Sequence, residues 1–183
     1  MLSLVKDINK NNYANLNLII SDNDHSIGLQ KAKELGLKTF VIDNKHYHGL
    51  AKKFDEKLNE IMKQENIQLI CLAGFMKILT PWFVERWENR ILNIHPSLLP
   101  KYKGLNTHER VIEAGDDKHG CTVHFVNADL DGGKILAQSI VEVSETDTAT
   151  TLAAKVLKKE HALYPKIVQK IICKDKYFYT NNG

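Results

Sequence analysis

The hydrophobic pattern of the first half of the chain alternates between short apolar runs and longer amphipathic stretches. Four short runs have the length and composition of buried strands: 16–21, 39–42, 69–73 and 91–94. Stretches with apolar residues at helical spacing predict helices at 2–10, 26–35, 49–65 and from Pro81 onward, with Thr80 as a possible N-cap. Strands that alternate with helices in this way predict a parallel sheet with helices on both faces.

The second half of the chain has a different pattern. Residues 121–126 and 134–143 have the pattern of strands, and the Leu-Asp-Gly-Gly turn at 130–133 lies between them. We therefore expect an antiparallel hairpin here. The stretch 148–173 predicts a terminal helical region that is interrupted at Pro165, because proline removes a helix hydrogen bond.

These elements define the expected fold class. With 183 residues, the chain is most simply one domain over 1–183, long enough for a sizeable core. We expect an α/β fold with a doubly wound, mostly parallel sheet and an antiparallel hairpin in its C-terminal half.

Composition and charge argue against several classes of protein. The net charge of +3 comes from lysines spread along the chain, which is too weak a signal for nucleic-acid binding. The three cysteines, Cys71, Cys121 and Cys173, form no C-x-x-C motif, and their odd number argues against a disulfide framework or a zinc site. No apolar stretch is long enough to cross a bilayer, and no signal peptide is evident. The sequence therefore predicts a cytoplasmic protein without membrane partners.

A polar pair marks the end of the fourth predicted strand. Asn93 and His95 stand two residues apart in an apolar run, so in an extended strand both point to the same side. Pro96 ends the ladder pairing at once. An amide that donates hydrogen bonds thus lies beside an imidazole that moves protons near neutral pH, where open α/β sheets bind ligands. The alternative to a functional pair is a purely structural one, in which His95 is a buried core histidine and Asn93 is a turn former.

Asp131 is the next candidate, and it has two compatible interpretations. Asp-Gly is a common hairpin-turn signal. A carboxylate on that turn could also orient His95 or accept a proton. The two residues are 36 positions apart, so sequence alone does not bring them together.

Several other positions are open to a structural or a functional interpretation. His108, where a glycine-started loop runs into a helix at 109–114, is a ligand contact or an exposed helix start. His124 could face either side of its strand, and His119 is expected to be structural in a polar loop. Glu160 lies on a lysine-rich, solvated helix face. The apolar segment 72–79 either wraps a flat ligand or belongs to the core.

Several segments, taken in order, closely resemble one family. They are Leu-Ala-Gly-Phe-Met-Lys-Ile-Leu at 72–79, Leu-Asn-Ile-His-Pro-Ser-Leu-Leu-Pro-Lys at 92–101, Gly-Cys-Thr-Val-His-Phe-Val at 120–126, Leu-Asp-Gly-Gly at 130–133 and Glu-His-Ala-Leu-Tyr-Pro at 160–165. They are similar to the phosphoribosylglycinamide formyltransferases of purine synthesis, and the likeness runs from about residue 16 to about residue 168. The resemblance implies formyl transfer from 10-formyltetrahydrofolate to the amine of glycinamide ribonucleotide, without a metal.

The resemblance also implies roles for particular residues. Asn93, His95 and Asp131 match the catalytic trio, and Asn93 and Asp131 also border the folate. The folate pocket further includes Met76, Lys77, Ile78 and Leu79. His108 and Glu160 match substrate-binding positions, which replaces the solvated-face interpretation of Glu160. Only small molecules are implied as partners, for a monomer or a homodimer.

Two departures from the family pattern stand out. Asn106 occupies a position where the family usually has histidine, so a cationic role there is lost. The family's first apolar strand and its Gly-Asn-Gly-Ser-Asn phosphate loop have no counterpart ahead of residue 2, so the domain is expected to be N-terminally truncated. A misassigned start is the favoured explanation; a weakened transferase and recruitment to another formyl-folate task are the others. We expect a high KM for the ribonucleotide.

Two other functions compete with formyl transfer. Formyltetrahydrofolate hydrolysis uses the same three residue types with water as the nucleophile. That family usually has a second histidine where Pro96 stands and a glutamate where Gly132 stands, so transfer is favoured. A folate-binding remnant with little transferase activity is the non-enzymatic alternative. Formyltransferases for sugar nucleotides or initiator tRNA carry an extra C-terminal domain, for which this chain has no room.

Overall fold

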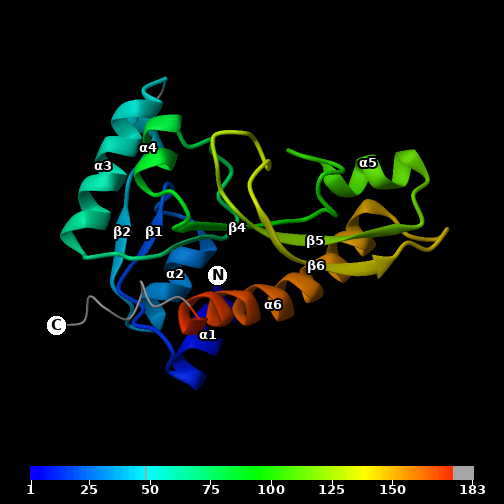
Figure 1. Cartoon of the computed structure of the whole chain (residues 1–183), viewed down its shortest axis with the longest axis horizontal. Helices are drawn as coiled ribbons and strands as arrows, with labels where there is room; N and C mark the ends of the chain where they lie inside the picture. Colours follow the sequence, from blue (N-terminus) through cyan, green and yellow to red (C-terminus); the bar gives the residue numbers. More distant parts are fainter. Residues whose placement is uncertain (48, 175–183) are drawn as a thin grey trace.

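The computed structural model describes residues 1–47 and 49–174 (Figure 1). Its elements in the first half are α1 (Leu2–Asn11), β1 (Ile19–Ser21), α2 (Ile27–Glu34), β2 (Thr39–Val41), a 3-10 turn η1 (Asn44–Tyr47), α3 (Ala51–Gln64), β3 (Ile70–Leu72), α4 (Pro81–Arg86) and β4 (Ile91–His95). The second half contains α5 (Thr107–Ala114), β5 (Lys118–Phe125), β6 (Ile135–Glu142) and α6 (Ala149–Lys174). The alternation predicted for the first half is confirmed, with the first three strands shorter than their apolar runs.

The strands form two sheets. Strands β1 and β2 pair in parallel, and a second sheet has the order β3-β4-β5-β6. Within the second sheet β3 and β4 are parallel, whereas β4–β5 and β5–β6 are antiparallel. The α/β class and the C-terminal antiparallel pair are thus confirmed. The connection between β5 and β6 spans residues 126–134, longer than a tight turn, and the ladder shifts register between Val123 and His124.

Two of the three apolar clusters among the described residues join the sheets to α1, α3, α4 and α6. One joins α3 and α4 to both sheets and includes Ile42, Phe54, Phe83 and Ile91. The other packs α1 and the C-terminal part of α6 against the four-stranded sheet, around Leu92. Figure 1 shows α6 running alongside β5 and β6, with α3 and α4 beside β1 and β2. Strand β4 contributes Ile91 to the first cluster and Leu92 to the second, so apolar packing anchors it on both faces.

The expected interruption at Pro165 is wrong. Helix α6 runs unbroken through this residue. Neither α6 nor any other helix in the described part of the chain could span a bilayer. Tyr164, Pro165, Ile167 and Val168 are all buried. Apolar packing on both sides of the proline offsets the hydrogen bond that its missing N–H removes.

Thr80 stands at the predicted N-cap position of α4 but does not cap it with its side chain. Its backbone N–H and its hydroxyl both donate to one carboxylate oxygen of Asp55, at 2.7 and 2.6 Å. Asp55 is buried on α3, so α4 is tied to α3 through this carboxylate. Burial raises the pKa of the Asp55 carboxyl, against the hydrogen bonds from Thr80.

Candidate active site

The predicted polar pair lies at the C-terminal end of β4, between β3 and β5. His95 is buried and Asn93 is half-buried, as alternate residues of one strand. Strand β4 pairs with β3 on one side and with β5 on the other. At Asn93 the partners are Leu72 of β3 and His124 of β5. The pair therefore projects from the most constrained part of the sheet.

Both nitrogens of the His95 imidazole face oxygen acceptors. Nε2 lies 2.9 Å from the backbone oxygen of Tyr102, which can only accept, so the Nε2–H group donates to it. Nδ1 lies 3.4 Å from a carboxylate oxygen of Asp131, and this contact becomes an ion pair when the ring is protonated. The surroundings of His95 thus match an imidazolium that donates on both sides.

Asp131 comes to this site on the long β5–β6 connection. Its backbone has a φ of 46°, in the left-handed region that aspartate tolerates better than most residues. The Gly104 N–H donates to the same carboxylate oxygen that faces His95, at 2.9 Å. The turn and the functional carboxylate are therefore compatible: the left-handed backbone at Asp131 directs its carboxylate toward His95, and the N–H of Gly104 holds the carboxylate there.

His124 belongs to the same group, and the sequence left its direction open. It is buried on β5 directly across from Asn93, and its Nε2 lies 3.2 Å from the amide nitrogen of Asn93. Its Nδ1 lies 2.8 Å from the carbonyl oxygen of Phe125. A Cβ on Gly133 would collide with that carbonyl, so only glycine fits there. In the sequence, the alternation of His124 with Val123 and Phe125 indicated a strand. It did not show which face of the sheet His124 would lie on.

His108 and His119 form a second imidazole pair nearby. Nδ1 of His108 lies 3.0 Å from Nε2 of His119, and the rings pack edge to face. The expectation that His119 lies in a polar loop is wrong, because β5 begins one residue earlier and buries its side chain. Burial lowers the pKa of His119 from 6.5 to about 4, and it also lowers the pKa of His108.

The predicted folate-binding segment lies between β3 and α4. Met76 and Ile78 are largely exposed, whereas the Leu79 side chain is buried in the core. The Lys77 ammonium lies 3.9 Å from the centre of the Phe54 ring and 4.0 Å from a carboxylate oxygen of Asp22. Met76 and Ile78 thus leave apolar surface on a loop that follows the strand next to β4.

Glu160 lies on α6, half-buried. Burial raises the pKa of its carboxyl, and the Met1 amino group lowers it. In the part of the chain that the structure describes, no hydrogen bond or ion pair joins Glu160 to Asn93, His95 or Asp131. Its predicted contact with a substrate amine therefore stays a prediction.

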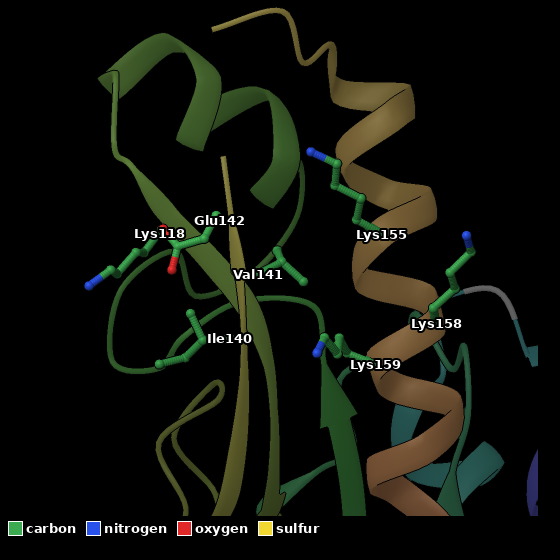
Figure 2. Close-up of a pocket in the computed structure, with 7 residues that line it drawn as sticks. All are labelled: Lys118, Ile140, Val141, Glu142, Lys155, Lys158 and Lys159. Carbon is green, nitrogen blue, oxygen red and sulfur yellow. The ribbon is translucent and has the colours of Figure 1, made fainter. Parts of the chain in front are cut away.

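A large open cavity lies away from this group, between β5, β6 and α6 (Figure 2). It has a volume of about 540 Å³. Its lining residues are Lys118, Ile140, Val141, Glu142, Lys155, Lys158 and Lys159. None of these is a predicted site residue, and in Figure 2 the labelled Lys118 and Lys158 chains extend away from each other toward solvent.

Comparison with known proteins gives the class of protein that this fold and site define. The formyl transferase family model matches residues 2–168, and the chain belongs to that family. The phosphoribosylglycinamide formyltransferase of Haemophilus influenzae is 41% identical over 85% of this chain and 73% of its own length. The solved phosphoribosylglycinamide formyltransferase of Bacillus halodurans superimposes with a TM-score of 0.91 at 30% identity, over 98% of this chain and 93% of that one.

The family also occurs inside much longer proteins. The trifunctional purine biosynthetic protein adenosine-3 of Gallus gallus is 45% identical over 87% of this chain. This chain spans only 16% of that protein's length. The likeness therefore concerns one part of the trifunctional protein.

Proposed function

We propose that this chain transfers a formyl group from 10-formyltetrahydrofolate to the amine of glycinamide ribonucleotide. One observation carries the proposal: the imidazole of His95 is held between a carbonyl and the Asp131 carboxylate, beside the amide of Asn93. The 41% identity to a phosphoribosylglycinamide formyltransferase supports the choice of substrate. Cytoplasmic location, small molecules as the only partners, and a monomer or homodimer belong to the same proposal.

The reaction forms one carbon–nitrogen bond and breaks another. The substrate amine attacks the formyl carbon, the formyl oxygen gains negative charge, and the bond from that carbon to the folate nitrogen then breaks. The Asn93 amide donates a hydrogen bond to the developing oxyanion, and the positive charge of a protonated His95 beside it stabilises the oxyanion. Asp131 faces His95 and stabilises its charged form. One proton leaves the attacking amine and one is gained by the leaving nitrogen, so protons balance, with His95 and Asp131 as the groups that move them.

The surface around the site suits a flat, partly apolar donor. Leu105 and Leu130 are exposed on the loops next to Gly104 and Asp131, in addition to Met76 and Ile78. Exposed apolar side chains that gather around convergent polar groups are typical of small-molecule sites. We infer that these side chains cover the folate rings while Asn93 and Asp131 contact the reacting end.

The test follows the absorbance change on formyl release from a 10-formyl folate analogue, with and without glycinamide ribonucleotide. Release that requires the ribonucleotide is the expected result. Release without it would replace the proposal with hydrolysis. Tight folate binding without release in either condition would identify a folate-binding remnant.

A further inference from the structure

The contacts of His124 determine which of its ring nitrogens carries a proton. Nδ1 lies 2.8 Å from the Phe125 carbonyl oxygen, which only accepts, so Nδ1 carries hydrogen. Nε2 lies 3.2 Å from the amide nitrogen of Asn93, which only donates, so Nε2 must accept and is bare. The two contacts independently define the same species, a neutral imidazole with its proton on Nδ1.

The electrostatic surroundings agree with this assignment. His124 is 2% exposed, and burial is the main cause that lowers its pKa. His95 and Lys103 lower it further, while the Phe125 carbonyl and the Asp131 carboxylate raise it. A carboxylate oxygen of Asp131 lies 3.7 Å from Nε2, outside hydrogen-bond range, whereas His95 is that carboxylate's nearer imidazole at 3.4 Å.

We propose that His124 is a positioning residue which, as a neutral acceptor, fixes the Asn93 amide with one N–H toward the ring and the other available to the formyl oxygen. The inference rests on the proposed function. An amide turned by 180° would set its oxygen against the bare Nε2, where the two lone pairs repel. It would also offer an acceptor where the oxyanion needs a donor. His124 therefore acts on the reaction through Asn93 and touches no reacting atom.

The first test is spectroscopic and uses the unaltered protein. In ¹⁵N-histidine-labelled protein at pH 7.5, the His124 ring should show a protonated Nδ1 and an unprotonated Nε2. The signal is assigned by its loss in His124→Gln. A proton on Nε2, alone or on both nitrogens, would overturn the inference. Because this readout needs no turnover, it separates failure of the inference from failure of the proposed function.

The second test is a double-mutant cycle between the two residues. His124→Leu removes the acceptor and should lower kcat about tenfold or more, with KM for the formyl donor nearly unchanged, because orientation matters most in the transition state. In an Asn93→Ala background the same change should cost less than about twofold, since there is no amide left to orient. His124→Gln, which retains an acceptor, should fall between the wild type and His124→Leu.

The matched control removes another buried imidazole from the same strand. His119→Leu, tested with and without Asn93→Ala, should give additive effects, because His119 pairs with His108 and not with Asn93. Additive effects of His124→Leu and Asn93→Ala would refute the positioning role. If His124→Leu does not fold, the ring spectrum and His124→Gln still decide the question.

Discussion

The two sheets of this molecule differ in how completely their strands are paired. In the four-stranded sheet, β4 and β5 each have a hydrogen-bonded neighbour on both sides. In the part of the chain that the structure describes, β1 and β2 pair only with each other, over three residues each. Two-stranded sheets are marginal on their own, so β1 and β2 depend on the cluster shared with α3 and α4. The doubly paired strands carry Asn93, His95 and His124.

The difference shows which part of the fold holds side chains in accurately defined positions. Reacting groups must be held within a fraction of an ångström, and central strands provide that better than short edges do. Apolar packing needs less geometric accuracy, and the smaller sheet takes part in it through Ile20, together with Ile42 directly after β2. Three predictions test this division, from the largest expected effect to the smallest.

The largest effect should come from His95→Ala. Loss of the imidazole should lower turnover about 10³-fold, because general acid–base and oxyanion contributions are both removed. Formyl-release kinetics measure the change, and circular dichroism checks folding. His46→Ala is the matched control, since it removes an exposed imidazole from the η1 turn near the smaller sheet. Turnover close to wild type in His95→Ala would break the assignment of catalysis to β4.

Acid should destabilise the four-stranded sheet through the His108–His119 pair. The folded-state pKa of His119 is about 4 against 6.5 in the unfolded chain, so between these values the unfolded state binds more protons. Stability is therefore full above pH 6.5 and declines as the pH falls toward 4, by about 3 kcal/mol. Urea unfolding across that range measures the slope. His119→Phe should flatten it, and an unchanged slope in this variant would exclude His119 as its source.

The smallest effect concerns local opening. Backbone amides of β1 and β2 that bond across their short ladder should exchange with deuterium about tenfold faster than those shared by β4 and β5. The reason is that opening a three-residue pair breaks fewer contacts than opening a strand paired on both sides. Hydrogen exchange followed by mass spectrometry resolves the two regions. Equal protection would mean that the two sheets open as one unit.

Much of the fold follows from local pattern, but the complete site does not. Period-two spacing placed Asn93 and His95 on one side of a strand, and that required only neighbouring residues. The contact between His95 and Asp131 depends on how residues 126–134 fold back, with a left-handed backbone at Asp131, so it was only one of two interpretations. The direction of His124 depends on which residue of β4 it faces. Pro165 was misjudged because buried packing outweighed a local helix-breaking signal.

The pairing of Asn93 with His124 makes the register of β5 against β4 important for function. Successive strand residues point to opposite sides, so a slip of one residue would put Val123 or Phe125 across from Asn93 and turn the imidazole to the other face. Gly133 packs against the same Phe125 carbonyl that accepts the hydrogen bond from Nδ1 of His124. A single residue inserted into β5 ahead of His124 would therefore turn the imidazole to the other face and release the Asn93 amide. Sequence variation here should be tolerated as substitution far more readily than as insertion or deletion.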